Sequence, residues 1–253
     1  MFFATATPAP GLKVAFTDRL DGSSNPPFDS FNLGKTDLDD PDDVLANFDE
    51  LRQALGVRHI VTVNQQHTAD VLIVNRRFLN SWGIGAEVGD AIEGQSRLPI
   101  ADALVTNERN VALAVRVADC VPVLLADPEH RVIAAAHAGR VGLLAGVLEV
   151  TVAQMRNLGA REISAWVGPH ICPACYEVPE QMARKAWELI PETEATSAKG
   201  TTAIDLGAGA QAVLESLGCG VEMLDACTCE TPSLYSYRRD GDLTGRSVGV
   251  ISQ

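Results

Sequence analysis

Short apolar runs of strand length, rich in β-branched residues and separated by turn residues, follow one another along the chain. Such runs between turns are typical of β-strands. The sequence therefore predicts strands at HIVTVNQ (59–65), DVLIVN (70–75), DALVTN (102–107), VALAVRV (111–117), PVLLAD (122–127), RVIAAAH (131–137), EISAWVG (162–168) and SVGVIS (247–252). Together these strands indicate a sheet-rich core.

Longer segments with helical spacing lie between and after these runs. Asp40 and Pro41 start a predicted helix. Its apolar positions are Val44, Leu45, Phe48, Leu51 and Leu55, and helices are also predicted over 139–159, 179–190 and 203–218. The elements are spread evenly, without repeat or linker. We therefore predict one domain over 1–253, of the mixed α/β (α+β) class, with a mixed β-sheet core flanked by helices.

The composition is that of a folded globular protein, with 46% hydrophobic and 21% charged residues. A net charge of −13 at pH 7 makes the molecule as a whole repel nucleic acid and anionic membranes. A bound phosphate would therefore need a local basic pocket. The chain starts without a basic n-region, and no stretch reaches the roughly 20 apolar residues of a membrane span. We expect a cytoplasmic protein with no nucleic-acid or membrane partner.

The chain has 6 cysteines, which a reducing compartment would keep as thiols. Cys172 and Cys175 have the C-x-x-C spacing, and Cys227 with Cys229 could complete a four-sulfur zinc site. The single residue within the second pair is too few for such a site, and a thioredoxin-like motif would need a helix where YEVPE follows. We therefore expect neither use.

Cys120 and His137 lie towards the two ends of the otherwise apolar segment VADCVPVLLADPEHRVIAAAHAGRVG. If the turn DPEH (127–130) joins two antiparallel strands, Ala126 faces Arg131 and Cys120 faces His137, with Cβ atoms about 4.5–5.5 Å apart. The two side chains could then share a metal ion or act as thiolate and base. The alternative is a small buried cysteine beside a hydrogen-bonded core histidine. The residues alone leave both open.

Metal binding and thiolate chemistry both need a third group. Zn²⁺ accepts sulfur and imidazole ligands, and a catalytic zinc site has three protein ligands and an open fourth position. His67 in NQQHTADV is the candidate, because it lies at the end of a predicted strand, where its side chain can reach a cleft. His59 and His130 are expected in exposed turns, and His170 in a Gly-Pro loop.

A candidate anion site is the segment YSYRRDGDLTGR, which gathers Arg238, Arg239 and Arg246 in an acidic protein. Paired guanidinium groups match the oxygen atoms of phosphate. The segment is therefore either an anion site or a solvated turn. The glycines of LGAGAQA fall within a predicted helix and indicate helix packing rather than a phosphate loop.

Taken together, these stretches resemble the family variously called multicopper polyphenol oxidase (laccase), purine nucleoside phosphorylase and peptidoglycan editing factor. The shared motifs are NLG (32–34), QQHTADV, ADALVT (101–106), ADCVPVLLADP, HAGRVGLLAGVLE, VGPHICPACYEV, CT (227–228) and SYRRDGDLTGR. Their order and spacing extend over almost the whole chain. In that family the histidine of Q-x-H, the cysteine of A-D-C and the histidine of H-A-G bind zinc. The resemblance therefore implies His67, Cys120 and His137 as ligands.

The resemblance also implies phosphorolysis of adenosine, inosine or methylthioadenosine, with deamination of adenosine, so that the partners are a purine nucleoside and phosphate. A three-ligand Zn²⁺ lowers the pKa of water to about 7 and makes it a nucleophile for the purine carbon that carries the amine. We expect catalysis by Cys120, His137 and Arg140, and substrate or phosphate binding by Asn32, Gln65, Arg238 and Arg239. Gln65 and Asp119 are also candidates for proton transfer or for support of a ligand.

Two positions depart from the family's pattern. The family's H-A-G-W-R-G reads HAGRVG here, which puts Arg140 and Val141 at the Trp and Arg positions. Phe48 follows Asn47 where the family often has an arginine. Phosphorolysis could therefore be weak or use another donor, whereas the implied zinc ligands are unchanged.

Three other functions fit some of these residues. A copper polyphenol oxidase is disfavoured, because oxygen reduction needs more copper ligands than 5 histidines supply, so zinc is expected rather than copper. A cysteine hydrolase or peptidoglycan-precursor editing enzyme would use Cys120 as nucleophile and His137 as base. A binding protein with a structural zinc would have a closed fourth coordination position.

Overall fold

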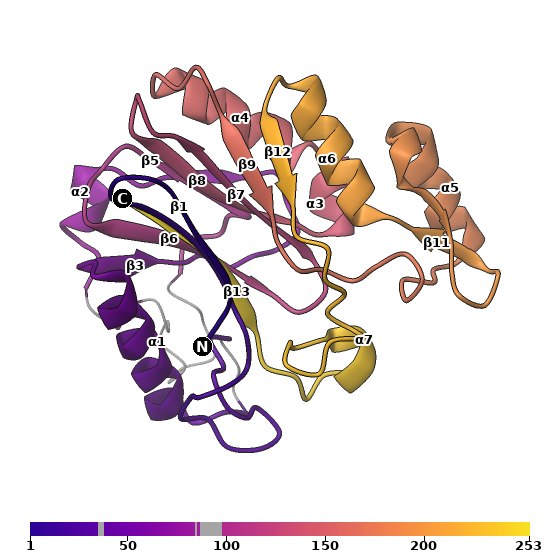
Figure 1. Cartoon of the computed structure of the whole chain (residues 1–253), viewed down its shortest axis with the longest axis horizontal. Coiled ribbons are helices and arrows are strands. Elements are labelled where there is room, and N and C mark those ends of the chain that lie inside the picture. The colour runs from indigo at the N-terminus through magenta and orange to yellow at the C-terminus, as the bar shows by residue number, and fades with distance from the viewer. Residues whose placement is uncertain (35–37, 84, 87–97) are drawn as a thin grey trace.

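Two β-sheets lie face to face, and helices cover the outer face of each (Figure 1). The computed structural model describes residues 1–34, 38–83, 85–86 and 98–253. The layers run helix, sheet, sheet, helix, which confirms the prediction of a mixed α/β domain. None of the helices in these described ranges combines the length and the hydropathy that crossing a membrane requires.

The first sheet has the strand order β1-β2-β13-β6-β3. β13 pairs antiparallel with both β2 and β6, so the two ends of the chain meet in one sheet. Helix α1 covers the outer face, where Phe48 and Leu51 pack in the same cluster as Ile60. The bounds are β1 Phe2–Ala9, β2 Leu12–Thr17, β13 Ser247–Ser252, β6 Val111–Val117, β3 His59–Val61 and α1 Pro41–Leu55.

The second sheet has the strand order β12-β9-β7-β8-β5-β4. It is mixed, because β12–β9 and β4–β5 are parallel pairs while the central strands are antiparallel. Helices α4 and α6 pack on its outer face. The bounds are β12 Gly220–Met223, β9 Ser164–Val167, β7 Val121–Asp127, β8 Val132–Ala138, β5 Ala103–Thr106, β4 Val71–Ile73, α4 Val147–Asn157 and α6 Leu206–Ser216.

Strand β7 shows why the central runs are apolar throughout. Val123 and Leu125 belong to the cluster under α4 and α6, whereas Leu124 and Ala126 belong to the layer between the sheets. Both faces of the strand are thus covered by apolar layers. A strand buried on both faces reads as a continuous apolar run rather than an alternating one.

Smaller elements complete the described chain. They are α2 Arg76–Leu79, α3 Arg140–Leu144, α5 Glu180–Leu189, the 3₁₀ helix Pro191–Thr193, β10 Glu194–Thr196, β11 Thr202–Ile204 and α7 Tyr237–Asp240. β10 and β11 form a separate two-stranded sheet beside α5. Helix α7 carries Arg238 and Arg239 of the candidate anion segment.

Capping explains where the predicted helices succeed and fail. The helix from Asp40 is confirmed: its carboxylate accepts the Asp42 amide at 2.9 Å, and Gly56 ends the helix in the left-handed conformation. The single helix predicted over 139–159 is wrong, because Gly146 at φ 88° separates α3 from α4. The helix predicted over 203–218 begins later, at Leu206, because β11 precedes it.

Several strands also differ from the sequence prediction. The runs at 59–65 and 70–75 yield short strands, β3 and β4. The sequence patterns do not predict β1, β2, β10 or β12. β3 ends at Val61 and β4 begins at Val71, so a loop joins them, and this loop carries His67.

Candidate functional site

The structure brings together His67, Cys120 and His137, which we call the inner cluster. Each residue offers one possible ligand atom, and the three atoms lie within 4.8 Å of one another. His137 belongs to β8, Cys120 directly precedes β7, and His67 lies in the loop between β3 and β4. Three distant parts of the chain therefore meet at one end of the second sheet.

The predicted register between β7 and β8 is wrong by two residues. Pro122, not Cys120, pairs with His137, and the hairpin loop is closed by Asp127 opposite Val132. A shift of two residues keeps the parity of the pairing, so Cys120 stays on the face of His137. The Cys120 sulfur still reaches the His137 ring.

A buried carboxylate, Asp102, supports both histidines. Its Oδ1 lies 2.8 Å from Nδ1 of His137. The backbone amides of Gln66, His67 and Thr68 donate to the same carboxylate at 3.0, 3.0 and 2.7 Å. Asp102 therefore orients one imidazole ring and shapes the turn that carries the other, as carboxylates behind metal ligands do.

The charges of the site favour a cation. Burial raises the pKa of Asp102, but hydrogen bonds from His137 and from the amides of Thr68 and Gln66 outweigh it and lower the pKa to about 2. Burial lowers the pKa of His137, but the Cys120 sulfur and Asp102 outweigh it and raise the pKa to about 9. Burial and the neighbouring His137 lower the pKa of His67. Asp102 thus stays negative beside the inner cluster.

The backbone around the inner cluster is strained. His67 has φ 58° and Asp119 has φ 99°, in the region that favours glycine. The Asp119 carboxylate accepts hydrogen bonds from the Thr228 hydroxyl and the Arg238 amide, both at 2.6 Å. These bonds fix Asp119, which directly precedes Cys120. A Cβ on Gly139 would lie 2.4 Å from Nδ1 of His67. Strain of this kind collects at functional sites.

A cavity of about 610 Å³ lies beside the inner cluster and is lined by all three of its residues. This volume is within the range of small-molecule pockets. The lining also includes Arg116, Arg238, Arg246, Tyr176 and Tyr237. Three ligands beside such a cavity leave room for water or substrate at a fourth coordination position, as in catalytic zinc sites.

Arg116 is a lining residue that the sequence analysis does not identify. Its Nε donates to the Leu33 carbonyl at 2.7 Å, and its guanidinium lies 5.6 Å from the centre of the Phe48 ring. Burial lowers its pKa to about 10, so the group is charged at neutral pH. The sequence does carry a signal for this residue, because Arg116 is the charged residue of the otherwise apolar strand VALAVRV. An arginine is rarely buried, so its place in such a strand indicates a special role. Phe48, where the family often has an arginine, thus lies beneath an arginine from β6.

Two predicted binding residues, Asn32 and Gln65, use their side chains for hydrogen bonds to the protein backbone. Asn32 is fully buried, and its oxygen accepts the amides of Gly34 and Arg246, both at 2.8 Å. Asn32 is not among the described residues that line the cavity. Gln65 does line it, and its amide exchanges two hydrogen bonds of 2.8 Å with the backbone of Arg116.

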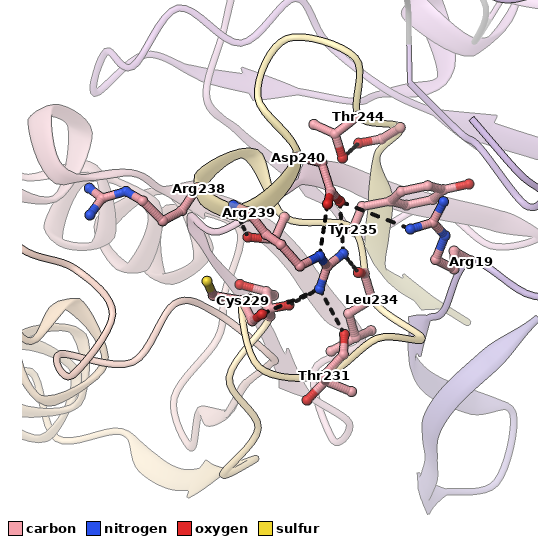
Figure 2. Close-up of polar contacts among 12 residues, drawn as sticks. Arg19, Cys229, Thr231, Leu234, Tyr235, Arg238, Arg239, Asp240 and Thr244 are labelled. Carbon is pink, nitrogen blue, oxygen red and sulfur yellow. Dashed lines mark hydrogen bonds and ion pairs between the residues drawn. The ribbon is translucent and has the colours of Figure 1, made fainter. Parts of the chain in front are cut away.

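The adjacent residues Arg238 and Arg239 point in different directions (Figure 2). Arg238 lines the cavity, donates to the Cys175 carbonyl at 2.9 Å and lies 5.2 Å from the centre of the Tyr176 ring. Arg239 instead donates to carbonyl groups of residues 228–234 and pairs with Asp240. Of these two predicted phosphate ligands, Arg238 faces the cavity.

Arg140, the third predicted arginine, begins α3 and lies beside Tyr176. Burial and the Cys120 sulfur raise the pKa of Tyr176, and Arg140 opposes this rise. Arg140 is not counted among the described lining residues, whereas Arg246 is. Nη1 of Arg246 donates to the carbonyl groups of Thr244 and Gly245 at 2.8 and 2.9 Å.

The remaining histidines lie outside the inner cluster. Nδ1 of His130 lies 2.9 Å from Asp127, and Nδ1 of His170 lies 2.8 Å from the Gly168 carbonyl. His59 begins β3. One thiolate and two imidazoles form a donor set that suits a single zinc ion and is too small for a multicopper centre.

Comparisons with known proteins agree with the motifs. The family model described as multi-copper polyphenol oxidoreductase laccase matches residues 13–253. A Streptomyces coelicolor protein named purine nucleoside phosphorylase is 44% identical over 246 residues, 95% of each chain.

Solved structures share the fold. The Neisseria meningitidis protein NMB0706 has a TM-score of 0.81 and 34% identity, over 99% of this chain and 98% of that one. YlmD from Geobacillus stearothermophilus has a TM-score of 0.83 and 29% identity, over 98% of this chain and 94% of that one. The chain therefore belongs to the multi-copper polyphenol oxidoreductase laccase family.

Proposed function

We propose that this chain is a zinc-dependent purine nucleoside phosphorylase that also deaminates adenosine. The observation that carries the proposal is a single cavity lined by a three-residue metal-ligand cluster and by three arginines. The names of relatives at 40–44% identity support the phosphorylase activity. A cytoplasmic location belongs to the proposal, because Cys120 must stay reduced to act as a thiolate ligand.

Zinc fits the inner cluster better than copper does. Sulfur and imidazole ligands suit Zn²⁺, and the hydrogen bond of His137 to Asp102 leaves Nε2 of that ring free to act as the ligand. When bound, the metal would act as a Lewis acid and lower the pKa of water. His67, Cys120 and His137 would hold it.

The arginines form the phosphate end of the proposed site. Arg116, Arg238 and Arg246 line the same cavity, and each donates hydrogen bonds to backbone carbonyl groups that fix its position. Fixed guanidinium groups match phosphate oxygens and need little ordering when the anion arrives. They supply the local basic pocket that an acidic protein needs for a phosphate substrate.

The reaction places clear demands on this cavity. In phosphorolysis the bond between C1′ of ribose and the purine nitrogen breaks, and a phosphate oxygen bonds to C1′. The base leaves with the electron pair and gains the proton that hydrogen phosphate loses. The arginines would hold phosphate against C1′ and balance its charge, so that positioning and electrostatics supply the rate enhancement. Tyr176 and Tyr237 offer aromatic faces and hydroxyl groups to the nucleoside.

The test is the dependence of base release on phosphate. Zinc-loaded protein is incubated with adenosine, inosine or methylthioadenosine, with and without phosphate, and the products are separated by chromatography. We expect free base and the 1-phosphate of the substrate's own sugar only when phosphate is present: ribose 1-phosphate from adenosine or inosine, and methylthioribose 1-phosphate from methylthioadenosine. Inosine should form from adenosine without phosphate. Cys120→Ser should abolish both reactions, and His130→Asn, a change outside the cavity, should leave them intact.

Zinc-loaded protein that releases no base in the presence of phosphate would contradict the phosphorylase proposal. Base release that is independent of phosphate would indicate a hydrolase instead. Metal analysis on the same sample separates an inactive site from an empty one.

A second candidate, a cysteine hydrolase, is favoured by one observation. Asp102, His137 and Cys120 lie in the order of a carboxylate, base and nucleophile triad, with Nδ1 of His137 on the carboxylate. Chelation decides between the two. A zinc enzyme loses activity with a chelator and regains it with Zn²⁺, whereas a cysteine hydrolase keeps its activity without metal and loses it to a thiol alkylator.

A further inference from the structure

A second group of possible metal ligands lies away from the inner cluster. Cys172, Cys175, Cys227 and Glu230 each offer one ligand atom, and these atoms lie within 4.8 Å of one another. We call these four residues the outer cluster. The three cysteines are partly buried and Glu230 is exposed.

Two loops supply the outer cluster with equal spacing. Cys172 and Cys175 come from the loop between β9 and α5, and Cys227 and Glu230 from the loop between β12 and α7. Each pair encloses two residues, so the pattern is C-x-x-C and C-x-x-E. The sequence analysis paired Cys227 with Cys229 and therefore missed the fourth group. Two ligand pairs of this spacing are typical of structural zinc sites.

The backbone holds the two loops together at this point. The His170 amide donates to the Ala226 carbonyl at 3.2 Å, and the Thr228 amide donates to the His170 carbonyl at 3.0 Å. The Cys175 amide donates to the Cys172 carbonyl at 3.1 Å, which turns the first loop back on itself. The ligand atoms are therefore gathered by backbone that is already ordered.

The distances within the outer cluster are close to those of a tetrahedral site. The Cys172 amide donates to the Cys227 sulfur at 3.3 Å, and the Cys172 sulfur lies 3.8 Å from a Glu230 carboxylate oxygen. A tetrahedron with Zn–S bonds of about 2.3 Å separates its ligand atoms by roughly 3.5–3.8 Å. The outer cluster needs a small contraction to reach this geometry.

We propose that the outer cluster binds one Zn²⁺ as a closed, four-ligand structural site that ties the two loops together. Three sulfur ligands select a soft or borderline ion and disfavour Mg²⁺ and Ca²⁺. The site also fixes one wall of the cavity. The carbonyl of Cys175 accepts a hydrogen bond from Arg238, and the next residue, Tyr176, lines the cavity.

The test removes the inner thiolate so that the outer thiolates can be observed alone. Cys120→Ser protein is stripped of metal under reducing conditions and titrated with Co²⁺, whose charge-transfer absorption reports thiolate ligands. We expect strong absorption that saturates at about one Co²⁺ per chain and is displaced by Zn²⁺. Adding Cys227→Ser should weaken the absorption and reduce the affinity at least tenfold, and so should Cys172→Ser.

Cys229→Ser provides the matched control, because it makes the same change in the same loop at a cysteine outside the outer cluster. We expect it to leave the Co²⁺ absorption unchanged. Loss of the absorption in Cys229→Ser but not in Cys227→Ser would overturn the ligand assignment. Circular dichroism of each variant checks that the fold is retained. If one of the two ligand variants fails to fold, the other still tests the site.

Two results would overturn the site itself. One is the absence of thiolate–Co²⁺ absorption in folded, reduced Cys120→Ser protein. The other is a native mass two hydrogens lower than the reduced mass, with the bond mapped to Cys172 and Cys227, since a disulfide would remove two ligands. Wild-type protein should contain about two Zn²⁺ per chain and each single ligand variant about one, so failure of the outer site is distinguishable from failure of the inner one.

Discussion

The inner and outer clusters both contain cysteine sulfur, but they differ in their other ligand atoms and in their surroundings. The inner cluster has three candidate ligands beside a cavity. The buried carboxylate of Asp102 orients the ring of His137 and accepts the backbone amide of His67. The outer cluster has four ligands on two loops and takes its order from backbone hydrogen bonds. Three ligands leave a coordination position for chemistry, whereas four ligands close the site. Ligand number and support, together with ligand type, therefore separate the proposed reactive site from the proposed structural one.

The largest contrast is expected when the same substitution is made in each cluster. Cys120→Ser should lower kcat/KM for phosphate-dependent base release by roughly 10³-fold or more, because the loss of a metal ligand removes several kcal/mol of transition-state stabilisation. Cys227→Ser should lower kcat/KM only about threefold. Steady-state kinetics with zinc analysis of each variant measures the difference. Equal losses in both variants, with the inner zinc retained in Cys227→Ser, would contradict the division of roles.

The carboxylate behind the inner cluster should have the next largest effect. Asp102→Asn weakens the partner of His137 and the acceptor for the His67 turn, so we expect zinc affinity and activity to fall about 10–100-fold. Competition with a chelating dye measures the affinity.

Asp127→Asn is the matched control, because Asp127 is also fully buried and accepts backbone amides, those of Arg161 and Glu162, far from the ligands. It should lower the melting temperature without changing zinc affinity. An Asp102→Asn protein with normal zinc affinity would show that the carboxylate serves folding alone.

The sequence predicts these features unevenly, for physical reasons. The capped helix α1 depends on neighbouring residues, and local signals identify it correctly. The meeting of Cys120 with His137 survives a wrong register, because only the parity of the pairing decides the face. Contacts between residues far apart in the sequence leave no local signal, so the roles of Asp102 and Arg116 are seen only in the structure. The one local indication is that Arg116 lies within an apolar strand.

The outer cluster shows a different obstacle. The pairing of Cys227 with Glu230 escapes a search for sulfur alone, because a glutamate in a polar loop looks like any solvated residue. Its role becomes visible once the fold places it 3.8 Å from the Cys172 sulfur. A carboxylate ligand is thus harder to predict from sequence than a cysteine ligand.

Arg238 connects the outer cluster to the cavity, and a change there should be of intermediate size. Arg238→Ala should raise the KM for phosphate about tenfold, since a charge-assisted hydrogen bond contributes roughly 1.5–3 kcal/mol. Arg239→Ala should instead lower the melting temperature by a few degrees, because its guanidinium holds the carbonyl groups of its own loop. Steady-state kinetics at varied phosphate concentration measures the first effect, and thermal unfolding measures the second. A larger phosphate effect in Arg239→Ala would reverse their assignment.

The smallest effect is expected from the outer metal on the cavity wall. Cys227→Ser should raise the KM for the nucleoside roughly threefold with little change in kcat, because Tyr176 and Arg238 lose a fixed neighbour but remain in place. If the link runs through the hydrogen bond of Arg238 to the Cys175 carbonyl, the double variant with Arg238→Ala should show less than the sum of the two free-energy changes. Full additivity would mean that the outer cluster stabilises its loops without influencing the cavity.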